Sequence, residues 1–206
     1  MSDEMCGLMG CAGVIDAPVV QELVNDIRRR GPDNLGIAWM ERATSDWELS
    51  RYRTPSWPEP FSLEIHGYSA AIAHARLATS GSTEPRDAQP FMLGDLIFAH
   101  NGTVYQHREL AAQHCLGLTT GNDSEALARL FLANKCDSER TYRALARHQT
   151  AGPHSWIAAY GRKMWIAVYG QPMYLLRSGP ASRYASSWRI PGSMEVLRGT
   201  VIEWNI

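Results

Sequence analysis

Apolar residues follow two spacings along the chain, and these spacings predict its secondary structure. In the first half, short apolar runs bounded by turn residues predict strands at 10–15, 35–41, 47–53, 70–74 and 96–100. Between the first two runs, apolar residues recur every four positions at Val19, Leu23 and Ile27. This spacing predicts a helix over residues 18–30, which the pair Gly31-Pro32 ends.

The middle of the chain carries helical patterns, and the last third returns to strands. Helices are predicted over 106–114, 123–134 and 138–149, the second opened by Asp123 and the third by Ser138 as N-cap. Runs at 155–160, 163–169, 173–177 and 182–187 are separated by glycine and proline, as in an antiparallel meander. Strands, then helices, then strands are typical of an α+β domain with antiparallel sheets.

Two further segments are predicted to be loops. Residues 79–90 are rich in Ser, Thr, Pro and Gly, and a loop of this length in a compact domain tends to be functional. The proline-rich stretch at 55–60 is short and contains Trp57, so we interpret it as a surface loop rather than a linker.

Composition restricts the classes of partner. The chain has 206 residues with a formal net charge of −1, so its length fits one domain and its charge favours neither nucleic acid nor an anionic membrane. No apolar run approaches the roughly 20 residues that span a bilayer. The four cysteines and the histidines lack metal-site spacing, and Cys11, Cys115 and Cys136 are expected to be packed thiols in a reducing, cytoplasmic compartment.

Four residues could together carry chemistry on an amide. Arg76 and Asn101 follow predicted strands, Asp123 opens a predicted helix, and Cys6 lies near the N-terminus. Taken singly, these residues have ordinary structural explanations: a strand end, a turn, a helix start and a buried thiol. Together they supply a cation, an amide donor, a carboxylate and a nucleophile, which suit a zwitterionic amino acid with a side-chain amide.

The segments around these residues match a known family in order. They are Cys6-Gly7-Leu8-Met9-Gly10, Arg30-Gly31-Pro32-Asp33, His74-Ala75-Arg76 with Thr79, Ala88-Gln89-Pro90-Phe91, His100-Asn101-Gly102 and Asp123-Ser124-Glu125. In these segments the chain resembles the class II glutamine amidotransferase domain of the N-terminal-nucleophile hydrolases. A weaker match continues to the C-terminal end, so the resemblance covers nearly the whole chain. It implies a four-layer αββα sandwich of two antiparallel sheets.

The resemblance also implies roles for individual residues, without a metal or a cofactor. Cys6 would be the nucleophile, with its own free α-amine as general base, and would form a thioester with glutamine. Asn101 and the backbone N–H of Gly102 would form the oxyanion hole.

Four residues would hold the substrate or the nucleophile in place. Arg76 and Thr79 would bind the α-carboxylate of glutamine, and Asp123 would bind its α-ammonium group. Arg30 would order the loop around the nucleophile.

This mechanism sets a condition on the N-terminus, because residues 1–5 precede Cys6. Either these residues are a cleaved leader, or translation starts at Met5, which is then trimmed. Residues 6–206 would in both cases form one amidotransferase domain. No synthase domain is apparent, so we expect ammonia to pass to a separate synthase or ligase subunit.

Three alternatives remain open at this stage. The chain could hydrolyse another γ-glutamyl amide, since Arg76 and Asp123 would still bind the glutamyl end. It could be a catalytically silent binding module if residues 1–5 are retained. A lipid anchor at Cys11 is disfavoured, because Asp3 and Glu4 occupy the place of a basic leader.

Overall fold

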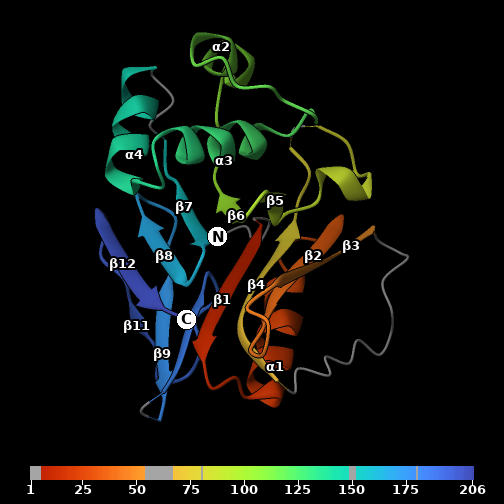
Figure 1. Cartoon of the computed structure of the whole chain (residues 1–206), viewed down its shortest axis with the longest axis vertical. Coiled ribbons are helices and arrows are strands. Elements are labelled where there is room, and N and C mark those ends of the chain that lie inside the picture. Colours follow the sequence, from red (N-terminus) through yellow and green to blue (C-terminus); the bar gives the residue numbers. More distant parts are fainter. Residues whose placement is uncertain (1–5, 54–66, 80, 149–151, 180) are drawn as a thin grey trace.

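Two antiparallel β-sheets lie face to face between layers of helices (Figure 1). This computed structural model describes residues 6–53, 67–79, 81–148, 152–179 and 181–206. The predicted leader at 1–5 and the predicted loop at 55–60 lie outside the described residues.

The strands divide unequally between the sheets. In spatial order, the first sheet contains β11 (Met194–Glu195), β9 (Tyr174–Ser178), β10 (Ser182–Ser186), β1 (Gly7–Gly13), β4 (Tyr68–Arg76), β2 (Asn34–Glu41) and β3 (Trp47–Arg53). The second sheet contains β12 (Thr200–Asn205), β8 (Lys163–Val168), β7 (Ser155–Tyr160), β6 (Leu96–Asn101) and β5 (Phe91–Leu93).

The helices cover the outer faces of the two sheets. Helix α1 (Ala17–Arg28) packs on the first sheet, whereas α2 (His107–Gln113), α3 (Asp123–Ala133) and α4 (Ser138–Arg147) pack on the second. Figure 1 shows α1 and the group α2–α4 at opposite ends of the view. None of the helices in the described part of the chain has the length and apolar character needed to cross a membrane.

Alternating side chains fill the layers between these elements. In β1, Leu8 faces the second sheet while Met9 faces α1, as the period of two in a strand requires. Leu8 packs in the cluster that contains Ile97 and Ile157 of the second sheet. Met9 packs in the cluster that contains Leu23 of α1. The predicted α+β class and the αββα sandwich are therefore confirmed.

The predicted meander of the last third is wrong in one respect. Strands β7 and β8 pair in the second sheet, whereas β9 and β10 pair in the first, so the chain crosses between the layers. Long-range pairing decides this, because β7 pairs with β6 and β10 pairs with β1. Such pairing is not encoded in the local pattern of either hairpin.

Helices α3 and α4 begin at the predicted residues, but the N-cap of each lies one residue earlier than predicted. Asp137, not Ser138, is the N-cap of α4, and its side chain accepts from the Arg140 N–H at 2.9 Å. Helix α3 is capped by Asn122, so that Asp123 is its first helical residue. Ser138 instead accepts a hydrogen bond from the Trp156 indole N–H at 3.3 Å.

The three other cysteines differ in exposure. Cys11 is buried and Cys136 is partly buried, as expected of packed thiols, but Cys115 is exposed. Cys115 lies just beyond the end of α2 with a φ of 54°, in a turn where its side chain has no core to enter.

Candidate active site

The candidate nucleophile lies where the ends of two neighbouring strands meet. Strands β1 and β4 are antiparallel and pair Gly7 with Ala75, which brings Cys6, just before β1, beside the C-terminal end of β4. Gly7 allows this strand end to approach α1, because a Cβ atom there would lie 2.2 Å from the carbonyl oxygen of Ile27. Strand β6 of the second sheet ends nearby at Asn101, whose side chain reaches Cys6.

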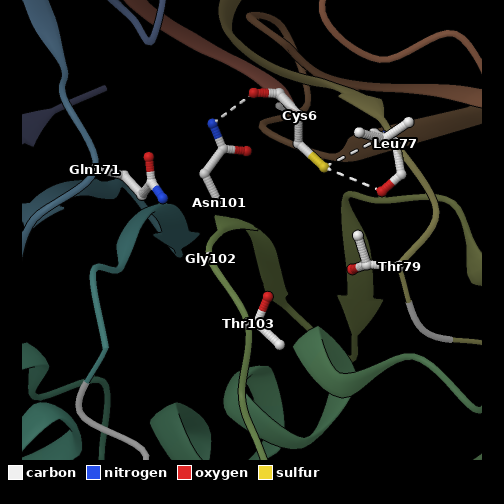
Figure 2. A pocket seen from close by; sticks show the side chains of 7 residues that line it. All are labelled: Cys6, Leu77, Thr79, Asn101, Gly102, Thr103 and Gln171. Atoms are coloured by element: carbon white, nitrogen blue, oxygen red, sulfur yellow. Dashed lines mark hydrogen bonds between the residues drawn. The ribbon is translucent and has the colours of Figure 1, made fainter. Parts of the chain in front are cut away.

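Cys6 forms hydrogen bonds with Leu77, just after β4, and with Asn101, at the end of β6 (Figure 2). The Leu77 N–H donates to Cys6 Sγ at 3.3 Å, and the thiol lies 3.5 Å from the Leu77 carbonyl oxygen. The side-chain Nδ2 of Asn101 donates to the Cys6 carbonyl oxygen at 2.9 Å. A cavity of about 140 Å³ opens here, and the described residues that line it are Cys6, Leu77, Thr79, Asn101, Gly102, Thr103 and Gln171.

The surroundings of Cys6 favour its protonated thiol. Burial raises the thiol pKa above its usual value of 9.0, and the negative charge of Asp123 acts in the same direction. The Leu77 N–H and the positive charges of Arg76 and Arg30 oppose this effect but do not overcome it. At neutral pH the thiol therefore needs a base before it can attack a carbonyl carbon.

Arg30 and Arg76 are buried and are not among the described residues that line this cavity. The Arg30 guanidinium donates to the Ser187 carbonyl oxygen at 2.7 Å, and Ser187 Oγ accepts from the N–H of Leu8 at 2.9 Å. Arg30 is thus linked to the start of β1, next to Cys6. The Arg76 guanidinium donates to Asn34 Oδ1 at 3.3 Å and to the carbonyl oxygen of Ser82.

The predicted substrate ligands Asp123 and Thr79 occupy different settings. Asp123 is 4% exposed, and its carboxylate accepts from the Val104 N–H at 2.6 Å. Val104 lies in the segment that connects Gly102 to α2. Asp123 also lies close enough to Cys6 to affect the thiol pKa. Thr79 is exposed and lines the cavity itself.

Sequence reasoning missed the part played by Asp33. Its carboxylate accepts from the Ala78 N–H at 2.7 Å, and its own N–H donates to the Arg76 carbonyl oxygen at 3.0 Å. Asp33 thereby fixes the segment that contacts Cys6. Asp33 ends the matched segment 30–33, which begins with Arg30, and this match was the signal that could have identified Asp33. Gln171, which also lines the cavity, belongs to no motif.

A buried histidine pair beneath Gly102 was also missed. His100 Nε2 lies 2.9 Å from His154 Nδ1, and His100 Nδ1 lies 2.9 Å from Ser124 Oγ. Gly102 has a φ of 136°, and a Cβ there would lie 2.8 Å from His100 Nε2 and 2.7 Å from His154 Nδ1. Only glycine fits this close approach. The described residues contain no cluster of three or more potential metal ligands.

Comparisons with known proteins identify the family of the chain. A family model of class-II glutamine amidotransferases matches residues 32–184. Glutamine–fructose-6-phosphate aminotransferase of Bradyrhizobium diazoefficiens is 30% identical over 132 residues, which are 61% of this chain and 21% of that protein. The Vibrio cholerae enzyme of the same name is 31% identical over 136 residues, covering 61% and 22%. The chain spans about a fifth of the length of these curated relatives.

Solved structures share the fold. Glutamine phosphoribosylpyrophosphate amidotransferase from B. subtilis superposes with a TM-score of 0.75 at 21% identity, over 97% of this chain and 47% of that one. A glutamine aminotransferase class-II domain protein from Silicibacter pomeroyi gives a TM-score of 0.66 at 18% identity, over 97% and 95%. Since the family model covers well over half of its residues, this chain belongs to the class-II glutamine amidotransferases, a family of enzymes with the N-terminal-nucleophile hydrolase fold.

Proposed function

We propose that this chain hydrolyses the side-chain amide of glutamine to glutamate and ammonia, with the Cys6 thiol as nucleophile. The observation that carries the proposal is one small cavity that contains the Cys6 thiol, the Asn101 amide and Gly102. A buried cation, Arg76, and a buried carboxylate, Asp123, lie close enough to act on that thiol. A nucleophile beside hydrogen-bond donors is the arrangement that acyl transfer requires.

The reaction would proceed through a thioester. Cys6 Sγ bonds to the amide carbon of glutamine, and the carbonyl oxygen becomes an oxyanion. Asn101 Nδ2 carries two protons, of which one binds the Cys6 carbonyl oxygen, so the second can bind the oxyanion together with the Gly102 N–H. The C–N bond then breaks, and the nitrogen leaves as ammonia with the proton taken from the thiol. Water hydrolyses the thioester to glutamate and regenerates Cys6.

The base in this proposal is the α-amine of Cys6 itself. Because the thiol pKa is raised, a nearby group must remove the thiol proton, and an α-amine with a pKa of roughly 8 is suited to neutral pH. An amide nitrogen has no available lone pair for this role. The proposal therefore requires Cys6 to be the first residue of the active chain.

Recognition of the amino acid would depend on charge. Arg76 would bind the α-carboxylate, and its contacts with Asn34 and Ser82 hold the guanidinium plane in place. Asp123 would bind the α-ammonium, and its contact with the Val104 N–H holds it beside the cavity. Thr79, which lines the cavity, would contact the carboxylate end. Arg30 would order the start of β1 through Ser187.

The experiment that tests this proposal compares two N-termini. A chain expressed as Met-Cys6, from which Met is trimmed, is expected to release glutamate from glutamine. The chain that retains residues 1–5 is expected to be at least about 100-fold slower, the lower range for loss of a general base. Intact-mass measurement confirms each terminus, and γ-glutamyl amides assayed in parallel test the substrate. Equal activity of both chains would overturn the role of the amine.

We also propose that the ammonia is used by a separate acceptor enzyme. The name of the relatives describes amino transfer from glutamine to fructose 6-phosphate, and those proteins are about five times the length of the matched region. Isolation of the chain from its native host is expected to yield a complex with a synthase or ligase, identified by mass spectrometry, which consumes ammonia when glutamine is supplied. A chain found only as part of a longer fused polypeptide would contradict the separate subunit.

A further inference from the structure

We infer that His74 is a positioning residue, whose Nε2–H orients the Asn101 amide so that the amide N–H, and not its oxygen, faces the cavity. This inference rests on the proposed function, because it assigns Asn101 to the oxyanion hole. His74 lies on β4, in the first sheet, and is fully buried. Its Nε2 lies 3.1 Å from Asn101 Oδ1, so the contact joins the two sheets at a residue that lines the cavity.

The direction of the hydrogen bonds follows from the partners of Asn101. The Cys6 carbonyl oxygen can only accept, so the Asn101 atom 2.9 Å from it must be the donor Nδ2 (Figure 2). The other end of the amide, Oδ1, therefore faces His74 and can also only accept. It follows that His74 Nε2 carries the proton in this contact.

The charge state of His74 agrees with this assignment. Burial and the nearby charge of Arg76 lower its pKa to about 3, so the imidazole is neutral at physiological pH. A neutral imidazole has one N–H, and the contact with Asn101 commits that proton to Nε2. His74 is thus a fixed donor that holds Oδ1 of the amide, while the Cys6 carbonyl oxygen holds Nδ2.

Loss of the donor would release the Asn101 amide. A turn of the amide by 180° would place Oδ1 towards the cavity, where it would repel the negative charge that develops on the substrate oxygen. Binding of glutamine before reaction depends on other groups, chiefly Arg76 and Asp123. We therefore expect His74→Leu to lower kcat by about 10- to 100-fold while KM changes by less than about threefold.

Conservative replacement should restore part of the activity. In His74→Gln the side-chain amide reaches about as far as the imidazole and can donate to Asn101 Oδ1. Its kcat is expected to lie between those of the wild-type chain and His74→Leu. His114, an exposed residue next to the end of α2, provides the matched control, and His114→Leu should leave both constants unchanged.

A double-mutant cycle tests whether His74 acts through Asn101. Asn101→Ala alone should lower kcat by about 100- to 1,000-fold. Adding His74→Leu to Asn101→Ala should then lower kcat by no more than about threefold, because the group that His74 orients is already absent. Fully multiplied effects, or a wild-type kcat in His74→Leu, would overturn the inference.

A spectroscopic measurement keeps the inference testable if these variants fail to fold or if the wild-type chain releases no glutamate. Nitrogen-15 NMR of the wild-type chain at pH 7 should show His74 as the neutral form with the proton on Nε2. A proton on Nδ1, or a charged ring, would overturn the inference whatever the activity. Absence of glutamate release from a correctly trimmed wild-type chain would instead count against the proposed function.

Discussion

Replacement of Cys6 by alanine is expected to lower glutamate release by about 10⁴-fold or more, because the proposed thioester cannot form without Sγ. The change removes one atom at the edge of the cavity, where Sγ is in contact with the backbone of Leu77. Steady-state assays with coupled detection of glutamate measure the loss, and circular dichroism with thermal unfolding establishes that the variant is folded.

Another cysteine provides the matched control for this variant. Cys136 has intermediate exposure, as Cys6 does, and its pKa is likewise raised by burial. It packs at the edge of the cluster on the outer face of the second sheet, on the side of α3 and α4. Cys136→Ala should retain wild-type activity. Residual activity of Cys6→Ala above about 1% of the wild type would contradict the nucleophile assignment.

Acid is expected to unfold the protein well above pH 3, because two buried histidines resist protonation in the folded state. The pKa of His74 is lowered by burial from 6.5 to about 3, and burial lowers that of His100 well below 6.5. Between pH 6.5 and about pH 3, His74 binds a proton in the unfolded chain but not in the folded chain. Stability therefore decreases as pH falls below 6.5, and the contribution of His74 continues to decrease until about pH 3.

The expected magnitude is large relative to the stability of a typical domain. One pKa unit corresponds to about 1.4 kcal/mol, so His74 alone should lower the free energy of unfolding by about 2 kcal/mol between pH 7.5 and pH 5. His100 acts in the same direction. Typical domains have a total stability of roughly 5–15 kcal/mol. Urea unfolding at pH 7.5, 6 and 5 measures the effect.

The variant His74→Gln serves as the control for this measurement. It lacks one of the two buried imidazoles whose pKa is lowered, and it should show a shallower dependence of stability on pH between 7.5 and 5. The pKa of Glu125 is lowered from its usual value of 4.5, so this carboxylate affects stability mainly below pH 4.5. It therefore does not obscure the change in stability between pH 7.5 and pH 5. A urea midpoint that is constant from pH 7.5 to pH 5 would refute the assignment of neutral buried histidines.

The sequence predicted the elements whose pattern is local. Apolar runs predicted strands at 10–15 and 70–74, and the structure places β1 at Gly7–Gly13 and β4 at Tyr68–Arg76. Helix α1 was predicted from a four-residue spacing, and its Leu23 and Ile27 are buried in the cluster that contains Met9 of β1, as that spacing predicts. Strands β5 and β11 contain only three and two residues, which is too short for any period to appear. They exist because a longer neighbour, β6 or β9, provides an edge for pairing.

The sequence predicted the main residues of the candidate site but not the hydrogen-bond partners that hold them in place. Matched motifs pointed to Cys6 and Asn101, and the structure brings both to one cavity. The partners that hold them were not predictable, because their contacts join segments that are distant in sequence. His74 and Asn101 are 27 residues apart, and His100 and His154 are 54 residues apart. No single-sequence pattern records such neighbours.

The crossing of the chain between β8 and β9 bears on how the site is assembled. The crossing segment contains Gln171, which lines the cavity, while Cys6 precedes a strand of the first sheet and Asn101 ends one of the second. Neither sheet contains a complete site. A folding intermediate in which only one sheet has formed would have its thiol without the opposing amide, or the reverse. Under the proposed function, a chain could therefore hydrolyse glutamine only after the two layers have docked.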